Sequence, residues 1–117
     1  WLNEVVHPAT RDGVQQRLRG FEQRGHECAA VEATLLIEAG WASLVDSLWL
    51  VVAPEDAVVE RLQRDRDQSP SATRERLSAQ MPAEQRRPHA DVVIVNDGDI
   101  EALRAKVASH YQQLMHA

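Results

Sequence analysis

A cluster of arginines is the feature of this sequence with the clearest potential for chemistry. Arg61 and Arg64 lie three residues apart, on one face of a helix expected to follow a buried strand. Arg66, Arg74 and Arg76 follow within the next dozen residues. Guanidinium groups near the carboxyl end of a strand can neutralise phosphoryl oxygens during group transfer. The alternative is a solvated helix whose arginines pair with the neighbouring carboxylates.

Two further polar positions suit the binding of an anion or a ring. His7 and Arg11 flank the expected start of a helix at Pro8, where backbone N–H groups and the helix dipole favour anions. The alternative is a histidine that caps the helix or packs at its entry. Asn96 follows another apolar segment, and it either turns the chain or contacts the ring of a ligand.

Histidine and cysteine do not indicate a metal site. His26, His89, His110 and His116 are scattered without ligand spacing, and Cys28 is the single cysteine. No metal ligands are therefore predicted in this chain. A single cysteine also excludes an internal disulfide framework and suits a reducing compartment, so the expected location is cytoplasmic.

Length and composition narrow the class of protein. The 117 residues are 26% charged and 44% hydrophobic, which predicts one globular domain over residues 1–117. The net charge of −5 argues against nucleic acid as a partner, and no apolar run is long enough to predict a membrane span. All but one of the 13 basic residues are arginine, the exception being Lys106.

The elements expected to position these residues alternate between strands and helices, which predicts an α/β domain with a parallel sheet and right-handed crossovers. Segment 82–88 is polar, and 41–45 holds at most one helical turn. Strands are expected at 28–37, 47–53 and 91–95, and helices at 8–24, 55–66, 69–80 and 100–114.

Read in chain order, several short motifs together resemble the dephospho-CoA kinase family. No single motif is decisive, but they span almost the whole chain. They are Trp1-Leu-Asn3 with His7-Pro8, Leu35-Leu-Ile-Glu38, Pro54-Glu55 after an apolar strand, Arg61-Leu-Gln-Arg64-Asp65, Arg76-Leu-Ser-Ala-Gln80, Ala90-Asp91 and Val93-Ile-Val-Asn96-Asp-Gly98.

This resemblance implies a P-loop kinase of the nucleoside-monophosphate-kinase type, with a three-layer α/β/α sheet and a helical lid. Such an enzyme moves the γ-phosphoryl group of ATP to the ribose 3′-hydroxyl of dephospho-CoA, the last step of coenzyme A biosynthesis, with Mg²⁺ bound. The resemblance makes Arg61 and Arg64 catalytic, and residues 68–88 the lid over ATP. It assigns ATP binding to Arg76, Gln80, Asn96 and Gly98, and binding of dephospho-CoA to His7, Arg11, Leu35 and Glu38.

The chain departs from the family pattern in three places. Thr34 stands where the family usually has proline, and Arg86 replaces a lysine of the lid. No G-x-x-x-x-G-K-[ST] motif occurs, so the P-loop and the main Mg²⁺ ligands are expected before Trp1. The expected partner for the exposed strand edges is that P-loop segment or another chain. The alternatives are a non-catalytic nucleotide- or protein-binding domain on the same scaffold, and a related small-molecule kinase.

Overall fold

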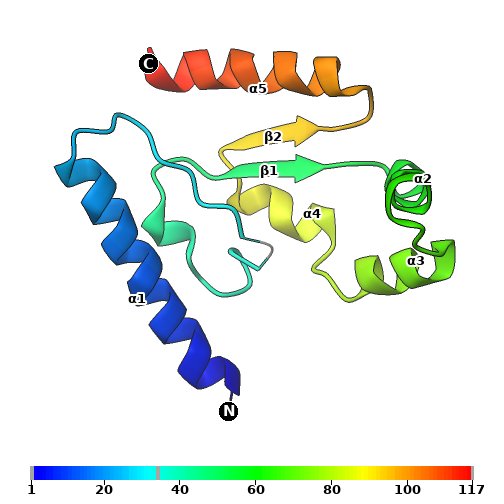
Figure 1. The fold of residues 1–117 in the computed structure, drawn as a ribbon, viewed down its shortest axis with the longest axis horizontal. Coiled ribbons are helices and arrows are strands. Elements are labelled where there is room, and N and C mark those ends of the chain that lie inside the picture. The colour runs from blue at the N-terminus through cyan, green and yellow to red at the C-terminus, as the bar shows by residue number, and fades with distance from the viewer. Residues whose placement is uncertain (1, 34, 117) are drawn as a thin grey trace. The chain divides into compact units, whose positions relative to one another are not determined.

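The computed structural model describes residues 2–33 and 35–116, with side chains from residue 9 onward in these ranges. The chain divides into two units, Trp1–Asp46 and Ser47–Ala117. One domain over 1–117 stays a prediction. In chain order the elements are α1 (Leu2–Gln23), η1 (Ala42–Leu44), β1 (Trp49–Val52), α2 (Glu55–Arg66), α3 (Pro70–Ser78), α4 (Ala83–Arg86), η2 (Arg87–His89), β2 (Val92–Val95) and α5 (Ile100–Met115) (Figure 1).

The first unit is built on the long helix α1, which begins well before the expected position. Pro8 lies inside this helix rather than at its first position, although an interior proline removes one backbone donor and disfavours a helix. The helix ends as predicted near Gly25, which has a φ of 82°. The N–H of His26 donates to the carbonyl oxygen of Phe21 at 3.1 Å and closes this end.

The strand expected at 28–37 is wrong for the described residues of that segment. Residues 28–33 form no strand, and 35–40 form successive turns. The N–H of Ala39 donates to the oxygen of Leu35 at 2.8 Å, and that of Gly40, with a φ of 76°, donates to Ile37 at 3.0 Å. The small side chains of Ala29 and Ala30 are exposed, so extended backbone here gains little from burial. The single turn expected in 41–45 is confirmed as η1.

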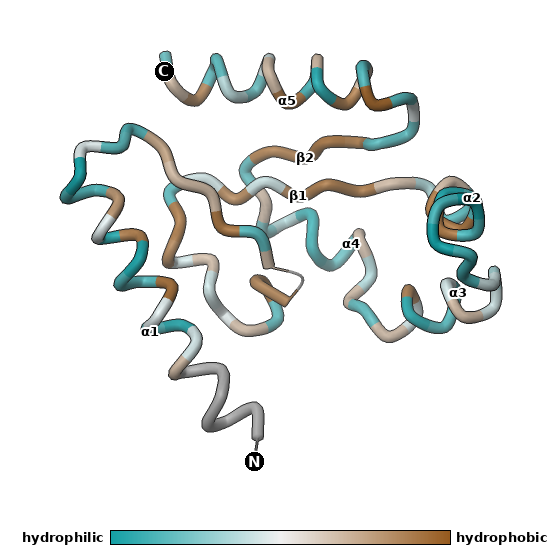
Figure 2. The backbone as a smooth tube through the Cα atoms, viewed as in Figure 1, coloured by the Kyte–Doolittle hydropathy of each residue, from teal (hydrophilic) through white to brown (hydrophobic). Residues whose placement is uncertain are grey.

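The second unit contains a small parallel sheet, as the sequence predicts. β1 and β2 pair in parallel with Trp49 opposite Val92 and Val52 opposite Val95. Beyond the pair, the N–H of Asn96 donates to the oxygen of Val52 at 2.7 Å. Both strands are apolar along their length, as the brown tube in Figure 2 shows. The described residues form two of the three expected strands, and the three-layer arrangement stays a prediction.

The core of the second unit lies between the sheet and the helices that follow each strand. Ile94 is 1% exposed, and Leu48, Leu50 and Val59 are also buried. Helix α5 lies along β2 (Figure 1), and the ring of Trp49 meets that of His110 edge-on at 6.0 Å. This ring contact joins the first residue of β1 to the second half of α5.

Local sequence explains where the remaining helices begin and end. Helix α2 matches the expected 55–66, and Asp67 ends it in the left-handed region with a φ of 51°. Helix α3 begins as predicted at Pro70, because the Ser69 hydroxyl oxygen accepts from the N–H of Ala72 at 3.2 Å. It ends at Ser78, short of the expected Gln80.

The polar segment 82–88 holds the short helix α4 and most of η2. The N–H groups of Gln85 and Arg86 donate to the oxygen of Pro82 at 2.9 and 3.2 Å. The run Ala83-Glu84-Gln85-Arg86 consists of good helix formers, so polarity alone did not make it a loop. No helix in the described part of the chain is long and apolar enough to cross a membrane.

Candidate functional site

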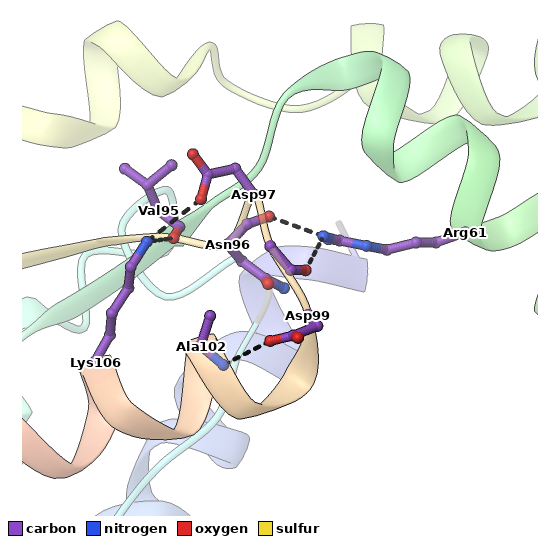
Figure 3. A network of polar contacts seen from close by, with 8 residues as sticks. Arg61, Val95, Asn96, Asp97, Asp99, Ala102 and Lys106 are labelled. Carbon is purple, nitrogen blue, oxygen red and sulfur yellow. Dashed lines mark hydrogen bonds and ion pairs between the residues drawn. The ribbon is translucent and has the colours of Figure 1, made fainter.

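Residues 96–99, here called the β2–α5 loop, meet a side chain from α2 at the carboxyl edge of the sheet. Arg61 Nη2 donates to the carbonyl oxygen of Asn96 at 3.1 Å and to that of Gly98 at 3.2 Å (Figure 3). The contact between Arg61 and the loop follows from the order of the strands. Because β1 and β2 are parallel neighbours, the segments that follow them leave the sheet at the same edge. The structure therefore brings together three of the predicted site residues.

A second cation contacts the same region from α5. Lys106 Nζ donates to the carbonyl oxygen of Val95 at 2.7 Å and to Asp97 Oδ1 at 3.3 Å (Figure 3). Its side chain is 43% exposed. Sequence reasoning noted Lys106 as the single lysine but gave it no role. The one signal in the sequence that singled out Lys106 is that it is a lysine where every other basic residue is an arginine.

The end of the β2–α5 loop next to α5 makes short-range contacts with the first turn of that helix. Asp99 Oδ1 accepts from the N–H of Ala102 at 2.8 Å and caps α5. A Cβ added to Gly98 would lie 3.3 Å from the Cβ of Ala102, which is closer than ordinary packing. Glycine at this position therefore allows the loop to run close to α5.

Asn96 is half-buried, and its backbone continues the sheet through the bond to Val52. Within residues 2–33 and 35–116, no hydrogen bond to its carboxamide is found. A carboxamide offers two donors and one acceptor oxygen, which suits the edge of a nitrogen heterocycle. The turn-forming and ring-binding interpretations of Asn96 are both compatible with this geometry.

Arg64, the second arginine predicted to be catalytic, does not contact the loop. Its Nε donates to Asp65 Oδ1 at 3.0 Å, and both side chains are largely exposed. The hydrogen bond to Asp65, followed by the attraction of its charge, raises the pKa of Arg64 above its ordinary value. The same hydrogen bond lowers the pKa of Asp65.

Helix α3 is anchored to the start of α2 by an arginine that has no predicted site role. Arg74 Nη1 donates to Glu55 Oε1 at 2.9 Å, and Nη2 donates to Asp56 Oδ1 at 3.4 Å. Hydrogen bonding to Glu55 and then to Asp56 raises the pKa of Arg74. Thr73, 1% exposed, accepts at its hydroxyl oxygen from the Gln68 amide at 2.9 Å and fixes the turn between α2 and α3.

Two further residues predicted to bind ATP, on and just after helix α3, take no part in the described contacts of the β2–α5 loop. Arg76 is exposed on α3, and Gln80 follows that helix half-buried, its N–H donating to the oxygen of Leu77 at 3.2 Å. Arg86 Nε is buried and has no hydrogen-bond partner among the described atoms.

The residues predicted to bind the acceptor substrate belong to the first unit. Arg11 Nη2 donates to the hydroxyl oxygen of Ser43 at 3.4 Å. Leu35 is 49% exposed, and Glu38 is exposed in the turns that follow. The side chain of His7 lies outside the described residues. No group of three or more His, Cys, Asp or Glu suited to a metal ion occurs among the residues that the structure describes.

Comparison with known proteins gives a consistent result. The family model for dephospho-CoA kinase matches residues 1–102. A dephospho-CoA kinase from Moorella thermoacetica is 39% identical to this chain, over 97% of this chain and 54% of the relative. Another, from Geobacter sulfurreducens, is 37% identical over 91% of this chain and 54% of the relative. A third, from Dehalococcoides mccartyi, is 33% identical over 91% of this chain and 54% of the relative.

The chain thus spans about half the length of these relatives, with a match that extends from its first residue through the β2–α5 loop. On that match, the chain belongs to the dephospho-CoA kinase family.

Proposed function

We propose that this chain forms part of an ATP-dependent dephospho-CoA kinase. The reaction joins the ribose 3′-oxygen of dephospho-CoA to the γ-phosphorus of ATP, breaks the bond to the β,γ-bridging oxygen, and releases ADP and a proton. The observation that supports this most is the meeting of Arg61 with the β2–α5 loop. Ligands of open parallel α/β sheets bind outside the carboxyl ends of the strands, which is where this meeting occurs.

Arg61 is proposed to stabilise the transferring phosphoryl group. Its Nη2 is used by the loop carbonyls, and no described contact uses Nε or Nη1. Those two nitrogens can each donate to a phosphoryl oxygen, one oxygen to each nitrogen, because both two-nitrogen forks of a guanidinium include Nη2. Arg64 joins it when the nucleotide binds, because its pair with Asp65 is exposed to solvent and therefore readily exchanged for another partner.

The nucleotide base is proposed to lie against the β2–α5 loop. The carboxamide of Asn96 can donate to a ring nitrogen and accept from the amino group of adenine. Gly98 allows close approach of the backbone to the ligand. Segment 68–88, with Arg76 and Gln80, is proposed to be the lid, since its helices α3 and α4 carry little buried apolar surface.

The acceptor substrate is assigned to the first unit. There, His7, Arg11, Leu35 and Glu38 are proposed to border dephospho-CoA, on family resemblance alone. A three-layer arrangement and a cytoplasmic location complete the proposal. The exposed free thiol of Cys28 agrees with a reducing compartment.

Mg²⁺, when bound with ATP, neutralises charge on the β- and γ-phosphates. Among the described residues, no group of three or more His, Cys, Asp or Glu forms a ready-made site for it. Its protein ligands are proposed to lie mainly in the P-loop segment.

The test joins this chain to the P-loop segment expected before Trp1 and measures CoA and ADP formed from dephospho-CoA and ATP. Arg61→Ala should reduce kcat far more than it raises the KM for dephospho-CoA, because the charge acts mainly in the transition state. One lost electrostatic contact of this kind costs about 2–4 kcal/mol, or about a hundredfold in kcat.

The matched control is Arg104→Ala, which removes an exposed arginine whose side chain pairs, among the described residues, with Glu101 at 3.4 Å. It should leave kcat unchanged. An Arg61→Ala enzyme with a kcat within about twofold of wild type would make Arg61 a surface charge. ATP binding without any transfer to dephospho-CoA would instead favour the non-catalytic domain.

A further inference from the structure

We propose that Lys106 is a positioning residue for the nucleotide base, acting with Arg61 to hold the β2–α5 loop so that Asn96 is presented to the ligand. This inference rests on the proposed function for the identity of the ligand as ATP. Nothing in the sequence pattern or in the family resemblance assigned a role to Lys106.

The loop backbone is held from two helices. Arg61 from α2 binds the carbonyl oxygens of Asn96 and Gly98, and Lys106 from α5 binds that of Val95. Figure 3 shows the two cations reaching the loop from separate helices. Three carbonyl oxygens within four residues therefore accept from positively charged donors, which form stronger hydrogen bonds than neutral ones.

This arrangement determines which groups remain for a ligand. With their carbonyl oxygens occupied, Asn96 and its neighbours cannot rotate their peptide planes without breaking these bonds. The backbone of Asn96 is thus fixed, and its carboxamide, which is not used in the described contacts, is available to a ligand. A preorganised polar group binds a ligand with less loss of conformational entropy than a mobile one.

Charge gives a second reason for a cation at this position. The loop carries the carboxylates of Asp97 and Asp99, which repel an anionic nucleotide. Lys106 lies 3.3 Å from Asp97 Oδ1 and offsets its charge, while Asp99 is engaged as the cap of α5. Lys106 lies in the first half of α5, where a cation gains nothing from the helix dipole. Its position is therefore explained by the loop and not by the helix.

The experiment compares Lys106→Met with wild type in the enzyme joined to the P-loop segment. The KM for ATP should rise about three- to thirtyfold, as expected for loss of a partly exposed, charged hydrogen bond. The KM for dephospho-CoA should change little, and the preference for ATP over GTP should fall because Asn96 is no longer fixed. Lys106→Arg should restore most of the ATP affinity.

Arg104→Met is the matched control, because it removes a cation from the same helix without touching the loop. It should leave both KM values unchanged. A merely structural role for Lys106 would lower the melting temperature but leave the ATP-to-GTP ratio as in wild type, which would overturn the inference. If Lys106→Met does not fold, Lys106→Ala introduces the best helix former and removes both the bond to Val95 and the charge opposite Asp97, and the same ratio decides.

Calorimetric titration of ATP separates this inference from the proposed function. ATP binding that Lys106→Met weakens, in a protein that does not phosphorylate dephospho-CoA, would overturn the proposed kinase and support the positioning role. Normal phosphoryl transfer with an unchanged KM for ATP in Lys106→Met would support the proposed kinase and overturn the positioning role. A wild-type protein that binds no ATP would overturn both.

Discussion

Replacing Asp91 with alanine should destabilise the second unit, because Asp91 joins the starts of the two strands. Its Oδ2 accepts from the backbone N–H of Leu48 at 2.7 Å. Its own N–H donates to the carbonyl oxygen of Leu48 at 2.8 Å. The substitution removes the first bond and keeps the second. Leu48 is buried, so its N–H would be left with poor access to water.

The size of the effect follows from the type of bond that is lost. A hydrogen bond to a charged group contributes about 1.5–3 kcal/mol, and an unpaired buried donor costs about 1–3 kcal/mol. These two figures describe the same loss, so we expect a decrease of about 2 kcal/mol in the free energy of unfolding. For a unit of this size, that corresponds to a melting temperature lower by about 10 °C.

Urea unfolding followed by circular dichroism measures this change. Asp91→Asn keeps an acceptor oxygen and should recover about half of the lost free energy, because neutral hydrogen bonds are about half as strong as charged ones. Asp46→Ala serves as the control, because it removes an exposed carboxylate two residues before Leu48. An Asp91→Ala protein within about 0.5 kcal/mol of wild type would refute the reasoning, since ordinary surface substitutions have effects of that size.

Three further outcomes are expected. Gly98→Ala should raise the KM for ATP by about fivefold through a crowded contact with Ala102, and Ala102→Gly should relieve it in the double variant. Asp65 should titrate in NMR below its ordinary pKa and return towards it in Arg64→Gln. Because this pKa is lowered by folding, the stabilisation from the pair is present at neutral pH and is lost as the pH falls through the lowered pKa. Amide hydrogen exchange in 68–88 should slow when ATP binds, and equal rates with and without ATP would contradict a closing lid.

The parts of the fold that the sequence predicts are those decided locally. Pro54 ends β1 and begins α2, and Ser69 caps α3 with its own hydroxyl. The strand at 28–37 failed because a strand also needs a partner, and pairing is a property of the whole fold. Its apolar letters resemble those of β1, yet residues 28–33 have no strand beside them in the described structure.

The candidate site, like the fold, could be predicted from the sequence only in part. The types of Arg61 and Asn96 suited phosphate and ring chemistry, with a solvated helix and a chain turn as the alternatives, and it is the parallel pairing of β1 and β2 that places them at one sheet edge. The sequence could not show that Arg61 spends one nitrogen on the loop carbonyls, nor that Lys106 holds the other end of that loop. Both depend on backbone oxygens, which every residue has and which no pattern of side chains reveals.

The parallel pairing of β1 and β2 has a consequence for the order in which the chain folds. Leu48 and Asp91, which open the sheet, are 43 residues apart. Closing a chain of that length costs about 3 kcal/mol in entropy beyond a constant, before any bond between the strands forms. The contacts of α2 with α3 span far fewer residues, with Arg74 and Glu55 19 apart, so we expect them to form first. During synthesis on the ribosome, β1 therefore cannot pair with β2 until β2 has emerged. A pause in translation before Asp91 would prolong the time during which this apolar strand is exposed and able to aggregate.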